Sequence, residues 1–367
     1  MSLIIQVTTV HPWWDNRIFE KIVTGLRRRR HNVLYVCQAG TDEVAAIPGP
    51  VVVLPMGSGF ATRISRNARA FIECARRPGA IVHFHDPEFV PFGLLLRLIG
   101  HRVIYDVHED NLLAIPQKGS LPRWIRVFVA RAVAAMEAVA SRFLTIVIAE
   151  HAYRGRFPSG VAVLNYPSAL SGPGLTEGVQ AVAAVADRRK LLYTGCLSED
   201  RGALNHVRLL RLLPDYELHL VGRCDAGLRD KILAEAGESR SRLHLRVSEE
   251  GVPFSEITKA YLEGGWCWGL ALFPDTPHYR DKELTKFFEY MSFRIPIICS
   301  DFPAWRRLID GRFGIVVDVE SLETVAETIR AHDERFQEYR EQPIGIPAEF
   351  TWESQLDSLE RLYSDSE

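Results

Sequence analysis

Short apolar runs alternate with helix-like stretches along the first 150 residues. The apolar runs lie at 3–9, 33–37, 51–54, 81–85, 102–107 and 143–148. The helix-like stretches include 17–30, 62–76, 88–99 and 122–140. Short apolar runs bounded by turns predict buried strands, and their alternation with helices predicts a parallel sheet in an α/β layer fold.

The same alternation begins again near residue 190. Strand-like runs lie at 191–194, 217–222, 243–247, 269–273, 295–299 and 314–318. A stretch rich in Pro, Gly, Ser and Ala precedes them and is typical of a linker. We therefore predict two tandem doubly wound α/β domains, 1–167 and 190–350, joined by a linker at 168–189.

The closing segment, 351–367, has an apolar helical stripe formed by Trp352, Leu356, Leu359 and Leu362. Such a stripe needs a surface to cover, and we expect it to pack back on the first domain.

Ligands of open parallel sheets bind beyond the carboxyl ends of the strands. Two such sheets facing each other would place the default site in the cleft between them. The candidate residues that follow predicted strands are His11, His85, Asp86, His108 and Glu109 in the first domain and Gly195, Arg201 and Gly222 in the second.

The histidines and carboxylates of the first domain allow three interpretations: a metal cluster, an acid–base group or a polar recognition rim. No fixed ligand spacing supports the metal interpretation. A single histidine at a strand end is commonly satisfied by nearby backbone, but two such clusters on successive strands favour a functional site.

The segment 284–303 combines an apolar helix face with charges. Phe287, Phe288 and Met291 have the spacing of a buried face, whereas Lys286 and Glu289 share another. These two charges could form a surface ion pair. Alternatively, the helix start could bind phosphate through its free backbone N–H groups. The segment alone leaves both interpretations open.

Composition places the chain among globular proteins, with 47% hydrophobic and 25% charged residues. We expect no secretory signal and no spanning helix, because no n-region with an apolar core opens the chain and no run of 18 apolar residues occurs. The six cysteines are dispersed, which predicts free thiols in a reducing cytoplasm.

The net charge of −2 is unevenly distributed. Residues 1–167 hold 20 Lys and Arg against 12 Asp and Glu, and the remainder holds 24 against 34. The basic half favours an anionic partner, although two solvated faces of opposite sign would give the same balance. The segment 121–133 is either an interfacial membrane helix or a core-packed helix with a basic face. We expect no nucleic-acid partner, because no recognised module is present.

Several motifs together resemble family 4 retaining glycosyltransferases of the GT-B fold. "TKFFEYMSFRIPIICSDFPAWRRLI" resembles their donor-site signature. "HPWWDNRIFEK", "FHDPEFVPFG", "VIYDVHED" and "VLNYP" resemble their N-terminal half in the same order. The terminal "TWESQLDSLERLY" resembles their closing helix, so the likeness spans nearly the whole chain.

The resemblance implies a role for each matching residue. Glu289 would bind the ribose hydroxyls of a nucleotide sugar, and the backbone near Leu284, Thr285 and Lys286 would hold the diphosphate. Arg201 would be a phosphate ligand. His108 would lie near the transferred sugar as a catalytic residue. The acceptor side would be lined by His11, Asp15, His85, Asp86 and Glu109.

The sequence also departs from the family pattern. Asp281 stands where a catalytic glutamate often contacts the donor sugar, and Glu283 is a rival for that role. Cys196 replaces a second basic phosphate ligand, and Arg294 replaces the usual glycine after the helix.

We therefore expect a retaining transferase that moves a hexose-type sugar from a nucleotide sugar to a glycan or lipid-linked acceptor in cell-surface polysaccharide or glycoconjugate biosynthesis. We expect it in the cytoplasm or peripherally at the inner, anionic membrane surface. No metal or other cofactor is expected if Arg201 and Lys286 neutralise the leaving group. The rivals are a sugar-nucleotide epimerase or phosphorylase on the same fold and a catalytically silent binding scaffold.

Overall fold

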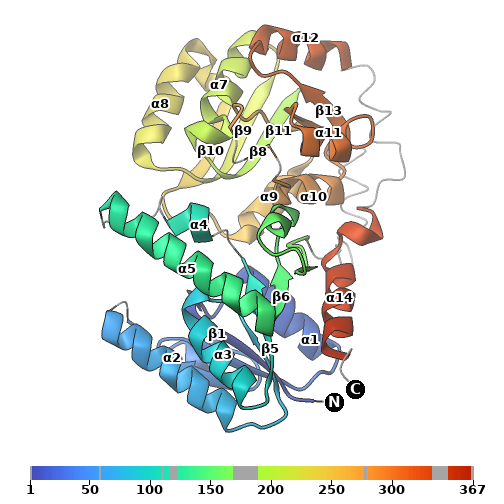
Figure 1. Ribbon diagram of the computed structural model, residues 1–367. Helices are drawn as coiled ribbons and strands as arrows, with labels where there is room; N and C mark the ends of the chain where they lie inside the picture. Colours follow the sequence, from blue (N-terminus) through green and yellow to red (C-terminus); the bar gives the residue numbers. More distant parts are fainter. Residues whose placement is uncertain are drawn as a thin grey trace. The chain divides into compact units, whose positions relative to one another are not determined.

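The computed structural model describes residues 2–57, 59–108, 111–115, 122–167, 189–276, 279–280, 282–332 and 346–364. The chain forms two compact units (Figure 1): Met1–Asn165 with Trp352–Glu367, and Tyr166–Thr351. Each unit contains one parallel sheet, which confirms the predicted class of two tandem α/β units. All but the last residue of the predicted linker 168–189 lie outside the described residues.

The first unit holds a seven-stranded sheet of order β3-β2-β1-β4-β5-β6-β7. Its strands are β1 (Ile4–Pro12), β2 (Val33–Gln38), β3 (Val51–Leu54), β4 (Ile81–Phe84), β5 (Arg102–Val107), β6 (Thr145–Ile148) and β7 (Val161–Ala162). Its helices include η1 (Asn16–Val23), α1 (Thr24–Arg28), α2 (Phe60–Ala75), α3 (Val90–Leu98), α4 (Asn111–Ala114), α5 (Arg123–Phe143) and α14 (Trp352–Ser364). The strand order reverses between β1 and β4, so their carboxyl ends mark the place where ligands of such sheets bind.

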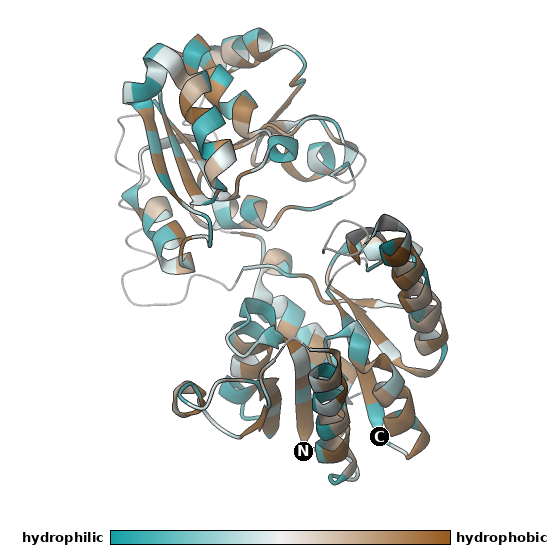
Figure 2. Cartoon of the chain, turned by 90° about the vertical axis from the view of Figure 1, so that its left-hand side faces the viewer, coloured by the Kyte–Doolittle hydropathy of each residue, from teal (hydrophilic) through white to brown (hydrophobic). Residues whose placement is uncertain are grey.

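Alternation along β1 separates two cores, because successive side chains of a strand point to opposite faces. Ile5 and Val7 pack with apolar residues of α2, α3 and α5, whereas Ile4 packs with those of η1, α1 and α14. Figure 2 shows the apolar strands between helices with one polar face.

Helix α14 lies on the first sheet although it ends the chain (Figure 1). Trp352, Leu356, Leu359 and Tyr363 join the core formed by η1 and α1. Trp352 Nε1 also donates to the carbonyl oxygen of Lys21 at 3.0 Å. The predicted stripe thus covers this face, with Leu362 only partly buried at its margin.

The first helix-like stretch, expected at 17–30, contains two kinds of helix. Residues Asn16–Val23 are π-helical and only Thr24–Arg28 are α-helical. The Asp15 side chain caps the start by accepting hydrogen bonds from the backbone N–H groups of Arg17 and Ile18, both at 2.9 Å. This cap satisfies donors that have no partner within the helix.

The second unit holds a six-stranded sheet of order β10-β9-β8-β11-β12-β13. Its strands are β8 (Lys190–Cys196), β9 (Glu217–Arg223), β10 (Leu243–Ser248), β11 (Trp266–Ala271), β12 (Ile297–Ser300) and β13 (Gly314–Val317). Its helices include α7 (Ala203–Leu212), α8 (Ala226–Ala236), α9 (Phe254–Glu263), α10 (Thr285–Ser292), α11 (Pro303–Ile309) and α12 (Leu322–His332). Here the order reverses between β8 and β11.

The strand expected at 269–273 begins earlier in the structure. Strand β11 begins at Trp266, three residues before the expected start at 269. Trp266 and Trp268 are fully buried. These two aromatic residues extend the buried strand toward the amino terminus of the expected run 269–273.

Two chain-wide expectations concern thiols and membrane spans. All six cysteines are free, and five of them are buried, as the dispersed spacing predicted. Among the described helices, none combines the length and the apolar character that crossing a bilayer requires.

Candidate functional site

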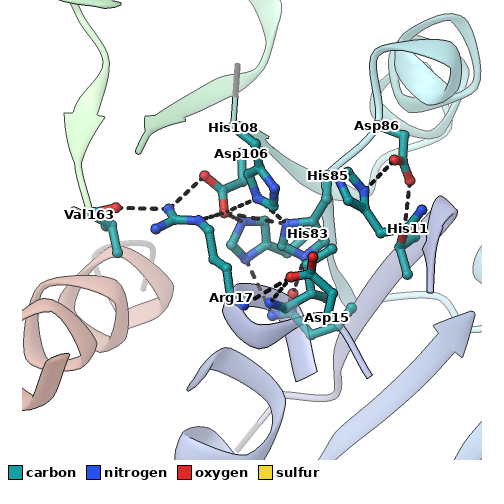
Figure 3. Close-up of polar contacts among 12 residues, drawn as sticks. His11, Asp15, Arg17, His83, His85, Asp86, Asp106, His108 and Val163 are labelled. Carbon is teal, nitrogen blue, oxygen red and sulfur yellow. Dashed lines mark hydrogen bonds and ion pairs between the residues drawn. The ribbon is translucent and has the colours of Figure 1, made fainter. Parts of the chain in front are cut away.

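The carboxyl ends of β1, β4 and β5 bring together the polar residues predicted in the first unit (Figure 3). His11 is the next-to-last residue of β1, His85 and Asp86 follow β4, and His108 follows β5. The His108 ring lies 5.0 Å from the His85 ring and 5.3 Å from the His11 ring, measured between centroids.

A buried ion pair lies at the centre of this cluster. Arg17 donates from Nη2 to Asp106 Oδ1 at 2.9 Å and from Nε to Asp106 Oδ2 at 3.1 Å. Arg17 Nη2 also donates to the carbonyl oxygen of Val163 at 2.8 Å. Burial raises the pKa of Asp106, but Arg17 and His108 outweigh it and hold the pKa well below its usual range. Asp106 is therefore a fixed carboxylate at neutral pH.

Asp106 orients His108. Its Oδ2 atom lies 3.0 Å from His108 Nε2, and His85 Nδ1 lies 3.1 Å from the same nitrogen. Burial lowers the pKa of His85 to about 4, so His85 is neutral. A carboxylate can only accept, which assigns the hydrogen to His108 Nε2. In the described part of the chain His108 Nδ1 has no partner, so this nitrogen is available to a ligand.

A second layer holds His85. His85 Nε2 donates to Gln6 Oε1 at 2.9 Å. The amide nitrogen of Gln6 in turn donates to Tyr363 Oη at 2.9 Å. Tyr363 Oη lies 2.7 Å from Nδ1 of the fully buried His83. The closing helix α14 thus supports the strand-end cluster through a residue 280 positions from His83.

Asp86 fixes the carboxyl-terminal part of β1. It accepts hydrogen bonds from Thr8 Oγ1 at 3.0 Å and from the Thr9 backbone N–H at 2.6 Å. Its other oxygen lies 2.8 Å from His11 Nδ1. Burial raises the pKa of Asp86, but His11 and the Thr9 N–H lower it below the usual value. His11, which remains partly exposed, is thereby held facing His108.

Two candidates of the first unit remain, Asp15 and Glu109. Asp15 is the cap of η1, and the hydrogen bonds of its side chain go to the helix start. Glu109 lies outside the described residues.

His83, His85 and Asp106 have ligand atoms within 4.8 Å of one another, close enough to share a metal ion. However, Arg17 already donates to both oxygens of Asp106. A divalent cation there would lie beside a buried guanidinium, which electrostatic repulsion disfavours. The arrangement fits a hydrogen-bonded cluster better than a metal centre.

In the second unit, Gly195 and Gly222 let neighbouring strand ends approach closely. Both have positive φ, 102° and 147°. A Cβ atom on Gly222 would lie 2.0 Å from the carbonyl oxygen of Gly195. Only glycine fits at the buried position 222. The backbone surface of Gly195 is half-buried, and a Cβ atom added there would meet only Lys286 Nζ, at 4.0 Å.

Lys286, in the first turn of α10, reaches this surface. Its Nζ atom lies 3.4 Å from the centre of the Tyr193 ring and 5.4 Å from that of Phe273. The residue is only 8% exposed, and Nζ has no hydrogen-bond partner among the described residues. Burial, with a further contribution from Arg201, lowers the pKa of Lys286 well below its usual range. These facts argue against the surface ion pair with Glu289.

Arg201 lies beside Lys286 at the strand-order reversal. Its Nε atom donates to Tyr279 Oη at 3.0 Å, and Tyr279 Oη donates to Asp200 Oδ2 at 3.2 Å. The guanidinium lies 6.0 Å from the centre of the Tyr279 ring. Arg201 is therefore held in place by an aromatic side chain, and its positive charge acts on Lys286.

Glu289 is positioned by a short chain of hydroxyl groups. Tyr261 Oη donates to Glu289 Oε2 at 2.6 Å and lies 2.8 Å from Thr194 Oγ1. Thr194 belongs to β8, so the carboxylate is tied to the same strand that carries Gly195. Glu289 itself is half-buried.

Other predicted donor residues lie at the start of α10. Leu284 is the N-cap of the helix and makes no side-chain capping hydrogen bond, and Thr285 is exposed. Glu283 Oε2 accepts from Tyr166 Oη at 3.5 Å. Asp281 lies outside the described residues.

Sequence reasoning missed the residues that hold these groups. Asp106 could have been found, because it lies two positions before His108, and alternation that continues past the end of β5 points both side chains to the same side. No sequence signal pairs Arg17 with Asp106 or Tyr261 with Glu289, which are 89 and 28 residues apart.

No protein-family model matches this chain, and no curated protein matches it in sequence. Solved structures match its fold. Sucrose-phosphate synthase from Thermosynechococcus elongatus matches with a TM-score of 0.66 and 14% identity, over 99% of this chain and 98% of its own. A glycosyltransferase from Rickettsia africae matches with a TM-score of 0.67 and 11% identity, over 100% and 99%.

Anabaena HepE in complex with UDP-glucose matches with a TM-score of 0.65 and 14% identity, over 99% of this chain and 100% of its own. At such identities the likeness establishes the fold. It is the GT-B fold that these glycosyltransferases share and that the sequence motifs predicted.

Proposed function

We propose that this chain is a glycosyltransferase that uses a nucleotide-sugar donor. The observation that carries the proposal is the buried amine of Lys286, which has no hydrogen-bond partner among the described residues and lies 4.0 Å from the Cβ position of Gly195. A buried charge without a partner destabilises a protein, so an anion that enters from outside would stabilise the charged form of this amine. The diphosphate of a nucleotide sugar supplies that anion.

The groups around Lys286 suit the leaving diphosphate. Helix α10 begins there without a side-chain cap, and such a helix start attracts phosphate. Arg201 brings a second cation. Charge develops on the diphosphate as the glycosidic bond breaks, and preorganised cations stabilise that charge. The proposed chemistry therefore needs no metal ion.

Glu289 completes the donor site in this proposal. Its carboxylate would accept hydrogen bonds from the ribose hydroxyls, while Tyr261 keeps it in place. The base is proposed to be uracil for a first test, because HepE is described in complex with UDP and with UDP-glucose.

The first unit is proposed to bind the acceptor. His108 Nδ1 would hydrogen-bond to the transferred sugar or the acceptor hydroxyl, with Nε2 held by Asp106. His11, His85 and Asp86 would line this side. Asp86 and Arg17 would act by positioning the histidines.

Finer features of the proposal rest on the sequence motifs. These motifs support membership of family 4, transfer with retention of configuration and a hexose-type donor. They also support a glycan or lipid-linked acceptor in polysaccharide or glycoconjugate biosynthesis.

The test is calorimetric titration with UDP and UDP-glucose. Wild type should bind both, whereas Lys286→Ala and Arg201→Ala should each weaken binding by about 1.5–3 kcal/mol. Uridine, which lacks phosphate, should bind the variants as it binds wild type. Arg312→Ala, which removes an exposed arginine, is the control. Equal UDP affinity in all four proteins would refute the proposed pocket.

We also propose that α5 docks on an anionic membrane surface at the cytoplasmic face. Trp124 is 73% and Phe128 is 71% exposed, and both line a shallow surface hollow with Val127 and Arg131. Exposed aromatic residues beside arginine are typical of helices that lie in a membrane interface. Such docking would bring the enzyme to a lipid-linked acceptor.

A further inference from the structure

Three side chains with metal-binding atoms meet at the amino-terminal ends of β9 and β10. Glu217 and His219 lie two residues apart on β9, and therefore on the same face of the strand. His244 on β10 is the register partner of His219. The sheet thus places one carboxylate and two imidazoles side by side.

Their atoms converge. Glu217 Oε2 lies 3.3 Å from His219 Nε2 and 3.5 Å from His244 Nε2. The two rings stack with centroids 4.2 Å apart and planes inclined by 20°. All three ligand atoms lie within 4.8 Å of one another. Trp266 packs edge-on against His219, with centroids 4.9 Å apart, and restricts that ring.

Tetrahedral zinc with ligands about 2.0–2.1 Å away has neighbouring ligand atoms about 3.3 Å apart. The two distances from Glu217 Oε2 match that separation. We propose that Glu217, His219 and His244 form a binding site for a divalent first-row metal ion, with zinc as the preferred occupant. Two histidines and one carboxylate are a common ligand set for such ions.

The carboxylate of this site is not taken by another cation. Within the described residues, Glu217 makes no ion pair with Lys or Arg, and the nearby Arg246 pairs with Glu263 on α9 at 2.6 Å. This distinguishes the site from the buried cluster around Asp106, where Arg17 occupies the carboxylate. Glu217 is 44% and His244 is 43% exposed in their side chains, so an ion can enter and keep water as a further ligand.

The ion would link two strands. Among the described strands, β10 lies at the edge of the second sheet and pairs only with β9, so a bound ion would join the edge to the body of the sheet. The proposed donor residues Gly195 and Gly222 lie at the opposite, carboxyl ends of the strands. The site is therefore structural, and it is independent of the proposed transfer reaction.

The test uses the full chain without an affinity tag. Zinc titration, followed by calorimetry and by metal analysis after gel filtration, should give about one ion per chain in wild type. Because zinc binds the folded site, the melting temperature should rise with zinc concentration. His244→Ala and Glu217→Gln, both at partly exposed positions, should weaken zinc binding at least about tenfold and remove this rise. His151→Ala, which removes an exposed histidine elsewhere, should leave both unchanged.

Cobalt gives a second readout, because tetrahedral coordination by nitrogen and oxygen produces visible absorption that depends on the ligands. Wild type and His151→Ala should show it, and His244→Ala should not. Unchanged zinc and cobalt binding in His244→Ala would overturn the proposal. The absence of zinc binding in wild type would also overturn it. Loss of zinc binding in His85→Ala but not in Glu217→Gln would overturn it too, because that result would place the ion in the first unit. UDP binding should be the same with and without zinc, so failure here leaves the proposed function untouched.

Discussion

The Nζ atom of Lys286 lies over the ring of Tyr193, 3.4 Å from its centre, and has no hydrogen-bond partner among the residues described. The ring face offers partial compensation for the ammonium charge, but burial still lowers the pKa of Lys286 well below its usual range. The free protein therefore disfavours the charged form of this amine, and an incoming anion would favour that form.

Binding of UDP should consequently draw a proton onto Lys286. The adjacent diphosphate favours the charged amine and raises its pKa. Protons are taken up at pH values between the free and bound pKa, and affinity falls as pH rises through the bound pKa. Calorimetry in two buffers of different ionisation enthalpy measures this uptake. Lys286→Arg, which stays charged, should bind UDP without it. A binding enthalpy that is the same in both buffers for wild type would contradict the prediction.

Glu289→Ala should weaken UDP binding more than tenfold. Each lost hydrogen bond from a ribose hydroxyl to the carboxylate is worth about 1.5–3 kcal/mol. UDP lacking both ribose hydroxyls is the matched ligand: wild type should bind it poorly, and the variant should bind it no worse than UDP. Tyr261→Phe, which frees the carboxylate from its hydroxyl partner, should have a smaller effect in the same direction. Wild-type affinity in Glu289→Ala would remove Glu289 from the donor site.

His108→Ala should lower the rate of sugar transfer by about 10²–10⁴-fold if His108 exchanges a proton with the acceptor. UDP affinity should stay unchanged, because the residue belongs to the first unit. Steady-state transfer assays and UDP titration on the same preparation separate the two effects. A variant with normal transfer, or one that loses UDP affinity instead, would show that His108 has been assigned the wrong role.

Arg294→Gly should stabilise the protein. Arg294 follows α10 with φ of 55°, a left-handed conformation that costs a non-glycine residue roughly 1–2 kcal/mol. Glycine removes this strain but gains freedom in the unfolded chain, so we expect a net gain of about 0.5–1 kcal/mol in the unfolding free energy. Denaturant titration measures it. Arg307→Gly, inside α11, is the control and should destabilise by about 1 kcal/mol; destabilisation by Arg294→Gly as well would refute the strain.

Vesicle flotation tests the proposed membrane face of α5. Binding to vesicles with anionic lipid should exceed binding to neutral vesicles and should fade as salt rises, because arginine attraction to the surface is screened. Replacing Trp124 and Phe128 by Ser should abolish it without unfolding the protein, since both side chains are exposed. Equal recovery with neutral and anionic vesicles would argue against this surface.

Much of the fold follows from sequence periodicity. The apolar runs correspond to strands of both sheets, and the helix-like stretches 62–76 and 122–140 correspond to α2 and α5. These features are local, because a strand buried on both faces must be apolar along its length. Glycines 195 and 222 were also visible in the sequence, since each follows a strand-like run.

The order of the strands and the partners of the charged residues came only from the tertiary structure. Arg17 meets Asp106 because β1 and β5 both flank β4, and Tyr363 reaches His83 because α14 returns to the first sheet. The hydrophobic pattern of a segment does not say which distant segment it packs against, because pairing any two apolar faces buries a similar area.

Lys286 shows the difference within one residue. From its position three residues before Glu289 it could be a surface ion-pair partner or a ligand of phosphate. The sequence by itself determined the helix and the shared face. Only the tertiary structure decided that the amine is buried over Tyr193, because burial depends on the strands packed beneath the helix and not on the helix itself.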